Sequence, residues 1–154
     1  MSQIYNALFN ALGYKPTNKK NGIFITATGT DVGKTYVSAI LVKSLRQSGI
    51  NAGYYKPVLS GADLIDDKII AGNCHYVCKL GKLPVDPNSL VTYTFLTSAS
   101  PHLASIIENQ AHGAQVDTLQ INPTPFVEKK HLLSGYEKLS NAYDFMIVEG
   151  CGGI

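Results

Sequence analysis

The sequence predicts an α/β fold built on an open, mainly parallel sheet with helices on both faces. An apolar run at residues 23–25 follows Gly22 and precedes a glycine- and threonine-rich turn, which is typical of a buried strand. An amphipathic segment begins at Lys34, and a second, fully apolar run occupies residues 145–148. Because strands and helices alternate, we expect a parallel sheet that binds its ligand at the carboxyl ends of the strands.

Composition limits the classes of protein that fit this chain. It has 154 residues, of which 45% are hydrophobic and 16% charged, which suffices for one core and one domain. The formal net charge is only +2 and the basic residues are scattered, so we expect no nucleic-acid surface. No apolar run reaches the roughly 18 to 20 residues that span a bilayer, and the N-terminus lacks the pattern of a secretory leader. We therefore expect a soluble, cytoplasmic protein without nucleic-acid or membrane partners.

The first helices and strands follow from local patterns. Residues 1–21 are expected to be an N-terminal extension with a short helix, because Ile4, Leu8 and Leu12 recur at four-residue intervals. In the domain at residues 22–154, a helix is predicted from Lys34 to a left-handed cap at Gly49, with apolar residues at helical spacing at Val37, Ile40, Leu41 and Leu45.

A second strand is predicted at residues 52–58, with Pro57 marking its end. This strand and the strand at residues 23–25 flank the helix, and a strand–helix–strand unit predicts a parallel pair with a right-handed crossover.

Residues 62–92 carry the weakest pattern, with a possible helix at 74–80 and a Pro/Asp/Asn-rich loop at 84–89. The spacing of Cys74, Cys78 and Cys151 matches no disulfide framework, which favours free thiols in a reducing compartment. The pattern Cys74-His75-x-x-Cys78 also permits zinc ligands, but a zinc site usually needs four and no second cluster follows. Ordinary cysteines on a helix face are favoured.

Two further helices are predicted from proline in the first turn. Ser100 and Pro101 supply an N-cap and a first-turn proline, with one apolar face formed by Leu103, Ile106 and Ile107. Thr124 and Pro125 do the same for a helix reaching about Ala142, whose core candidates are Leu132, Leu133 and Leu139.

The strongest chemical signal is the segment I-T-A-T-G-T-D-V-G-K-T at residues 25–35. It lies between a predicted strand and a predicted helix, where backbone N–H groups and the helix dipole would hold phosphate oxygens. Lys34 would neutralise phosphate charge, and Thr35 would offer its hydroxyl to magnesium. Thr28 stands where the strict motif has its first glycine, and Gly29 follows one residue later. The segment is therefore a variant phosphate-binding loop, and a chance Gly/Thr turn before Lys-Thr is the alternative.

Two charged residues stand at the ends of predicted strands. Glu149 ends the apolar run at 145–148, a position from which a carboxylate can reach a magnesium ion beside Thr35. Lys56 occupies the tip of the second strand, where it would add positive charge next to bound anionic groups. The alternative for Lys56 is a solvated lysine at a strand end.

Four motifs in order and spacing resemble dethiobiotin synthetase: A-T-G-T-D-V-G-K-T, K-P-V-L-S-G, S-P-H-L-A and V-E-G-C-G-G. The resemblance implies a P-loop NTPase-like fold and ATP-dependent ring closure of 7,8-diaminononanoate with CO2, through a carbamate and its mixed anhydride with phosphate. It implies that Lys56 stabilises the carbamate and the phosphoryl group in transfer, that Ser60 contacts substrate, and that Thr35 and Glu149 hold magnesium. The ATP phosphates would be bound by Asp31, Val32, Gly33, Lys34, Thr35 and Tyr36.

Two features depart from the family pattern. A further aspartate contributes to the magnesium and ATP site in the family, and the alignment places Asn73 there, with Asp66 or Asp67 as alternatives. Family members also continue for several strands and helices beyond Ile154, which carry the adenine pocket and much of a homodimer contact. On this basis the domain is expected to be incomplete at its C-terminus.

Two other functions remain open at the level of sequence. A non-catalytic nucleotide-binding remnant would bind nucleotide without turnover, and Asn73 is compatible with it. A P-loop ATPase switch of the partitioning or nitrogenase-reductase kind shares the fold, but it typically has a second lysine early in the loop, and none lies between Gly22 and Gly33.

Overall fold

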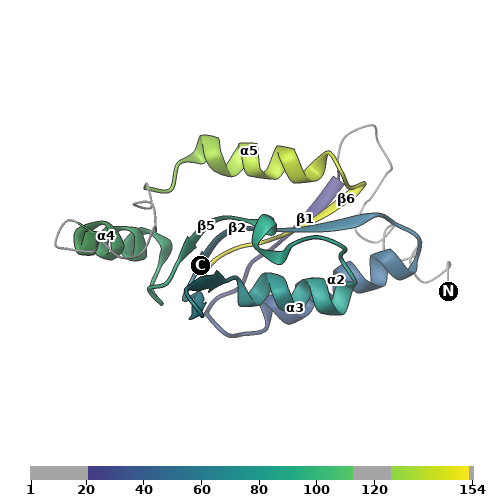
Figure 1. The fold of residues 1–154 in the computed structure, drawn as a ribbon. Helices are drawn as coiled ribbons and strands as arrows, with labels where there is room; N and C mark the ends of the chain where they lie inside the picture. The colour runs from purple at the N-terminus through teal and green to yellow at the C-terminus, as the bar shows by residue number, and fades with distance from the viewer. Residues whose placement is uncertain (1–20, 113–125, 153–154) are drawn as a thin grey trace.

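The computed structural model describes residues 21–112 and 126–152, and these form an α/β fold around a parallel sheet (Figure 1). The helix predicted near the N-terminus lies outside the described residues. The main sheet has the order β1-β6-β2-β5, and all three pairs of neighbours are parallel. Its strands are β1 (Asn21–Ile25), β2 (Ala52–Ser60), β5 (Val91–Phe95) and β6 (Phe145–Glu149).

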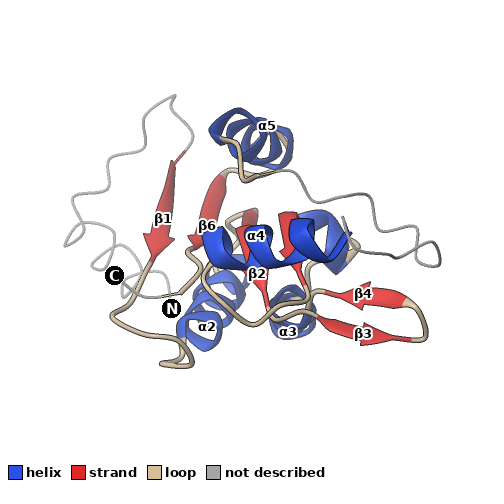
Figure 2. Cartoon of the chain, turned by 90° about the vertical axis from the view of Figure 1, so that its left-hand side faces the viewer, coloured by secondary structure: helices blue, strands red, loops and turns tan. Residues whose placement is uncertain are grey.

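Helices cover both faces of the sheet, which confirms the predicted architecture. In Figure 1, α2 (Lys34–Gln47) and α3 (Gly72–Gly81) lie on one side of the sheet and α5 (Lys129–Ser140) on the other. The fourth helix, α4 (Pro101–His112), lies near the carboxyl ends of β2 and β5, and Figure 2 shows it in front of the strands. The short helix η1 (Pro87–Leu90) leads into β5.

The position of β6 differs from the simple pairing that the sequence predicted. β1 and β2 run parallel, but they are not neighbours, because β6 lies between them and pairs with both. The side chains of Phe145, Met146 and Ile147 are buried, and a strand that is apolar on both faces is best accommodated inside a sheet. As a result the strand that ends in Glu149 lies between the strand that enters the glycine-rich loop and the strand that carries Lys56.

Pro57 does not end its strand, contrary to the prediction. β2 pairs with β6 only as far as Tyr55, and from Lys56 it pairs with β5 through to Ser60. Pro57 therefore lies just beyond the β6 pairing, and the ladder to β5 carries the strand onward past it. The longer strand brings Ser60 to the same end of the sheet as Lys56.

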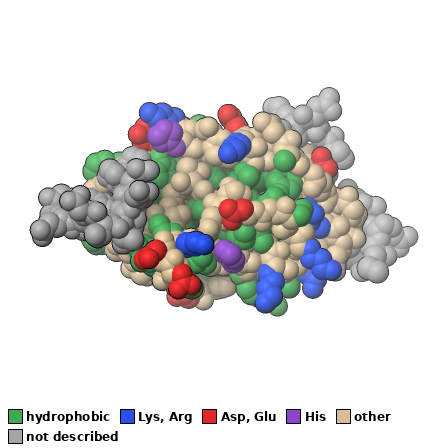
Figure 3. Space-filling model, viewed as in Figure 1, with side chains coloured by type: hydrophobic (Ala, Val, Ile, Leu, Met, Phe, Trp, Pro, Cys, Tyr) green, Lys and Arg blue, Asp and Glu red, His purple; other side chains and the backbone are tan. Residues whose placement is uncertain are grey.

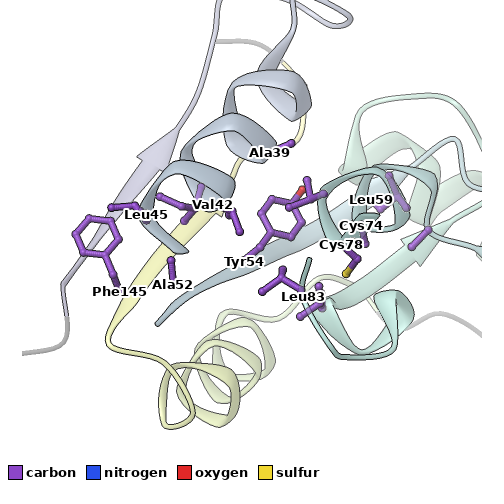
Figure 4. Packing of buried hydrophobic residues seen from close by; sticks show 14 residues of the cluster. Ala39, Val42, Leu45, Ala52, Tyr54, Leu59, Cys74, Cys78, Leu83 and Phe145 are labelled. Atoms are coloured by element: carbon purple, nitrogen blue, oxygen red, sulfur yellow. The ribbon is translucent and has the colours of Figure 1, made fainter. Parts of the chain in front are cut away.

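The main core lies between the sheet and the pair α2 and α3 (Figure 4). Ala39 and Val42 of α2 and Cys74 of α3 are fully buried around Tyr54 of β2. Cys74 and Cys78 are thus free core thiols on a helix face, as favoured from the sequence. A second cluster, formed by Val58, Tyr93, Phe95 and Ala104, fixes α4 near the end of the sheet.

The two later helices differ from the predictions in their faces and in one boundary. α4 begins at Pro101 as predicted, but Leu103 is 48% and Ile107 41% exposed, whereas Ala104 and Ser105 are buried. α5 begins at Lys129 and not after Thr124-Pro125, because residues 126–128 are not helical. Leu132 and Leu139 pack against the two clusters, but Leu133 is 51% exposed, so its assignment to the core was wrong.

The weakly patterned region contains two features that the sequence did not predict. A two-stranded hairpin is formed by β3 (Asp63–Ile65) and β4 (Lys68–Ile70), and its turn residues Asp66 and Asp67 both have positive φ. The second unpredicted feature is the strand β5, which directly follows η1. The predicted helix at 74–80 is confirmed as α3, which extends from Gly72 to Gly81.

The surface and the helix lengths bear on possible partners. On the face that Figure 3 shows, side chains of both charges are present, with hydrophobic side chains between them. Among the helices of the described part, none combines the length and apolar character that a membrane crossing needs.

Candidate functional site

The glycine-rich loop connects β1 to the first turn of α2, as the sequence predicted. Gly33 is the residue before the helix, and its φ of 98° lies in the left-handed region, which favours glycine. No side chain caps the helix at this position, so the first N–H groups of α2 remain available to an anion. The Lys34 ammonium donates a 2.6 Å hydrogen bond to the Gly29 carbonyl, which holds the lysine over its own loop.

The sheet register brings Glu149 to this loop. Glu149 is paired with Ile25, the last residue of β1, and the preceding Val148 is paired with Tyr55 of β2. The carboxylate is completely buried and accepts a 2.8 Å hydrogen bond from the Thr35 hydroxyl on Oε1. The carboxylate that the sequence predicted beside Thr35 is therefore in direct contact with it.

Lys56 contacts the same oxygen of this carboxylate. Its Nζ atom lies 2.7 Å from Glu149 Oε1 and 3.0 Å from the carbonyl oxygen of Gly150. The side chains of Lys56 and Glu149 are 5% and 0% exposed, so the alternative of a solvated lysine is wrong. A buried ion pair contributes little net stability because desolvation is costly, but losing one partner leaves an uncompensated charge.

Asn73 lies at the first turn of α3 and contacts the loop helix. Its side-chain amide donates to the Thr35 hydroxyl at 2.5 Å, so Thr35 accepts from Asn73 while donating to Glu149. Asp66 and Asp67 instead form the turn of the β3–β4 hairpin and do not line the cavity at Thr35. Of the three candidates for the further magnesium and ATP position, only Asn73 is at the site.

A cavity of about 650 Å³ lies over these residues. It is lined by the glycine-rich loop, the carboxyl end of β2, the start of α3, residues 98–101 before and at the start of α4, and the turn after β6. Of the predicted site residues, Asp31, Gly33, Lys34, Thr35, Lys56, Ser60, Asn73 and Glu149 line it. Val32 and Tyr36 do not line it, and each is 58% exposed.

Three parts of the site were missed from the sequence. Tyr54 donates a 2.8 Å hydrogen bond to Glu149 Oε2, and it lies two residues before Lys56 on the same face of β2. That alternation was the signal that could have found it. Cys151 contacts Ser60 at 3.4 Å. Ser100 and Pro101, which line the cavity, belong to the S-P-H-L-A motif, for which no role at the site was predicted.

Burial and charge keep the neighbouring acidic groups neutral. Burial, followed by the nearby negative charge of Glu149, raises the pKa of Tyr54 well above its ordinary value. Burial, with Cys78 as the next cause, raises the pKa of Cys74 to about 12. The Tyr54 hydroxyl is therefore a protonated donor toward the carboxylate, and Glu149 has Lys56 as its counter-charge.

The oxygen donors of the site suit a hard cation of the magnesium type. The Thr35 hydroxyl and the Glu149 carboxylate lie together, with the amide of Asn73 beside them. Magnesium commonly keeps several waters and takes only one or two carboxylates, so this small set fits it. Within the described residues, no group of three or more His, Cys, Asp or Glu side chains forms a denser metal cluster.

β1 lies at the edge of the described sheet and Phe24 is 61% exposed, so the prediction of a buried strand at residues 23–25 was wrong. A glycine-rich loop between a parallel strand and a helix, with a carboxylate at the end of the adjoining strand, defines a P-loop nucleotide-binding protein. The comparison with protein families agrees with this class. The model of a family described as "AAA domain" matches residues 21–154, and the chain belongs to that family.

The resemblance to dethiobiotin synthetase is confirmed by curated proteins. The chain is 43% identical over 133 residues to the ATP-dependent dethiobiotin synthetase of Clostridium botulinum strain Loch Maree. The aligned residues make up 86% of this chain and 52% of that protein. Proteins of the same name from strains Alaska E43 and Eklund 17B are 41% and 40% identical over the same shares. The chain thus spans about half the length of the curated relatives it matches.

Proposed function

We propose that this protein takes part in ATP-dependent dethiobiotin synthesis, in which 7,8-diaminononanoate, CO2 and ATP give dethiobiotin, ADP and phosphate. The observation that supports this most is the buried carboxylate of Glu149, which contacts both Thr35 of the phosphate-binding loop and Lys56 of β2. One residue thereby joins the place where ATP phosphates would bind to a lysine suited to an anionic substrate. The curated relatives carry the corresponding name.

The phosphates of ATP would be bound by residues 31–36. The uncapped first turn of α2 and the left-handed Gly33 offer N–H groups to phosphate oxygens. Lys34 would exchange the Gly29 carbonyl for the β- and γ-phosphates, because a charged phosphate oxygen is a stronger acceptor for an ammonium group than a neutral carbonyl oxygen. Val32 and Tyr36 would contribute backbone groups.

Magnesium would be held by Thr35 and Glu149, with Asn73 at the further position that is acidic in the family. A bound magnesium ion would neutralise phosphate charge. Asn73 supplies no charge of its own, so among these three residues Glu149 would supply the carboxylate. The contacts of Thr35 with both Glu149 and Asn73 support the grouping of these three residues.

The chemical steps follow from the substrates. One amine of the diamine adds to CO2 and loses a proton, giving a carbamate, and a carbamate oxygen attacks the γ-phosphorus of ATP. ADP leaves, and the product is a carbamic–phosphoric anhydride. The second amine then attacks the carbamoyl carbon, loses a proton and expels phosphate, which closes the cyclic urea. Negative charge accumulates on oxygen atoms throughout, so a fixed cation nearby stabilises the reaction.

Lys56 is suited to stabilise this charge, and Ser60 to contact the substrate. An ammonium group has three N–H donors, and the described contacts of Lys56 use two of them, on Glu149 and on Gly150. The remaining donor would serve the carbamate or the phosphoryl group. Ser60 lies at the end of β2 and lines the same cavity. By the same resemblance we propose a cytoplasmic homodimer.

Phosphate release measured with and without the diamine separates this proposal from the alternatives. We expect release from ATP only when 7,8-diaminononanoate, bicarbonate and magnesium are all present. Equal release without the diamine would favour a P-loop ATPase switch. Nucleotide binding with no release under any condition, also for the protein expressed from its intact gene, would favour a non-catalytic nucleotide-binding protein.

A further inference from the structure

Glu149 has a third partner that lies outside the cavity. Its Oε1 atom accepts from Thr35 and Lys56, whereas Oε2 accepts a 2.8 Å hydrogen bond from the hydroxyl of Tyr54. Tyr54 is completely buried and does not line the cavity, so it cannot touch nucleotide or diamine from its present position. Its effect on the site must therefore pass through Glu149.

The ring of Tyr54 is held by the core. It lies between α2 and α3 in Figure 4, and it belongs to the cluster that contains Ala39, Val42 and Cys74. A side chain packed in this way has little rotamer freedom, so its hydroxyl has a fixed position. From this position the hydroxyl donates to Glu149 Oε2 at 2.8 Å.

We infer that Tyr54 is a positioning residue that fixes the Glu149 carboxylate so that Oε1 faces the Thr35 hydroxyl, where a magnesium ion would bind. A carboxylate can rotate about its bond to the side chain, and without a donor on Oε2 both oxygens would become available to Lys56. Tyr54 occupies Oε2 and leaves Oε1 at 2.8 Å from Thr35 Oγ1. Partners that orient a metal ligand commonly affect metal affinity about 10- to 100-fold.

This inference rests on the proposed function in one respect, namely that Glu149 holds magnesium together with nucleotide. The chain offers a matched control for it. Tyr55 is the adjacent residue, is 2% exposed, and points its hydroxyl away from the site to Thr92 and to the Leu132 carbonyl. Tyr54→Phe and Tyr55→Phe therefore each remove one buried hydroxyl and keep the ring, but only the first change touches Glu149.

The test is calorimetric titration with ADP of the wild type and of both variants, once with magnesium and once with a chelator. For Tyr54→Phe we expect affinity in magnesium to fall by about tenfold or more, and affinity in chelator to stay at the wild-type value. Tyr55→Phe should match the wild type in both conditions. Thermal melting by circular dichroism checks that each variant is folded.

Each other outcome has a defined meaning. Equal magnesium dependence in Tyr54→Phe and wild type overturns the inference while leaving the proposed function intact. Equal losses with magnesium and with chelator mark a merely structural role and overturn it as well. A wild type that binds no ADP, or binds it independently of magnesium, contradicts the proposed function itself.

A second measurement on the wild type covers the case in which Tyr54→Phe does not fold. The chain has nine tyrosines and no tryptophan, so its near-ultraviolet difference spectrum reports tyrosine. Adding magnesium to the ADP complex should produce a tyrosine difference band, because the charge on Glu149 next to the Tyr54 hydroxyl becomes shared with the metal. The band should vanish in Glu149→Gln. A wild type without the band would overturn the inference.

Discussion

The ammonium of Lys56 lies 2.7 Å from Oε1 of Glu149 at the carboxyl end of the sheet, and the two side chains are 5% and 0% exposed. The register of the strands produces this contact, because β6 lies between the strand that enters the phosphate-binding loop and the strand that carries Lys56. The ion pair has a structural and a chemical consequence, and the two can be measured separately.

Replacing Lys56 should destabilise the protein. Lys56→Ala leaves the Glu149 charge buried and without its cation, and losing one partner of such a pair typically costs about 3–5 kcal/mol in the free energy of unfolding. Urea unfolding followed by circular dichroism measures the change. The control is Lys130→Ala, which breaks the exposed pair with Glu128 and should leave the unfolding midpoint unchanged. Equal effects of both substitutions would contradict the buried pair.

Replacing Lys34 should remove most of the affinity for nucleotide phosphates. A charge-assisted hydrogen bond contributes about 1.5–3 kcal/mol, so Lys34→Ala should weaken binding of ADP by about 10- to 100-fold. Calorimetric titration of wild type and variant checks this. Because the described hydrogen bond of the Lys34 ammonium goes to the Gly29 carbonyl of its own loop, the melting temperature should change little. Equal affinity in both proteins would show that the loop does not bind phosphate through this lysine.

Replacing Asn73 by aspartate should strengthen magnesium binding. Asn73 contacts Thr35, and a carboxylate there adds a charged oxygen ligand for a hard cation. Titrations of ADP at several magnesium concentrations should show half-saturation at lower magnesium in Asn73→Asp. Without magnesium the added charge lies near Glu149, so the same variant should melt at a lower temperature. Unchanged magnesium dependence would place Asn73 outside the metal site.

Gly135 should be required for the close approach of α5 to the sheet. A Cβ atom there would lie 2.8 Å from the Tyr55 hydroxyl and would also collide with the Thr92 side chain. Alanine favours helix over glycine by about 1 kcal/mol, but overpacking costs about 1–3 kcal/mol and would disturb the Tyr55 hydrogen bonds. Gly135→Ala should therefore lower the free energy of unfolding, whereas Ser134→Ala on the exposed side should not. Stabilisation by Gly135→Ala would contradict the close packing.

The protein should lose stability in alkaline solution. Burial raises the pKa of Cys74 from 9.0 to about 12 and that of Cys78 to about 11. Between the ordinary and the raised pKa the unfolded chain has released protons that the folded chain retains, so the free energy of unfolding falls as the pH rises. Urea unfolding from pH 8 to pH 10.5 should show this decline, with a shallower slope for Cys74→Ala. Constant stability across this range would be inconsistent with buried thiols.

Much of the fold and of the site follows from the sequence because local patterns determine it. Strand, glycine-rich loop and helix were predicted at the correct places, and so was the carboxylate at the end of β6. The features of the fold that were not predicted depend on contacts between segments that are distant in the sequence. The insertion of β6 between β1 and β2 is one example, and the exposure of Leu133 on α5 is another. Local periodicity does not reveal which neighbour covers a helix face.

The contact of Tyr54 at the site could not be predicted from local patterns either. Its position two residues before Lys56 is visible in the sequence, but its hydrogen bond to Glu149 depends on the register between β2 and β6. The prediction that Pro57 ends its strand was wrong for a related reason. Whether a proline interrupts a strand depends on which neighbouring strand is paired with it at that residue, and β2 changes from β6 to β5 there. Asn73 was located through the resemblance, and its contact with Thr35 comes from the packing of α3 against α2.

The most direct test of the proposed function is product formation from labelled bicarbonate. The protein expressed from its intact gene is mixed with 7,8-diaminononanoate, ¹³C-bicarbonate, magnesium and ATP, and the products are analysed by mass spectrometry. We predict dethiobiotin carrying one ¹³C atom from the wild type and none from Lys56→Ala, although that variant still binds ADP. Absence of labelled dethiobiotin from a wild type that binds ADP, or undiminished product from Lys56→Ala, would contradict the account.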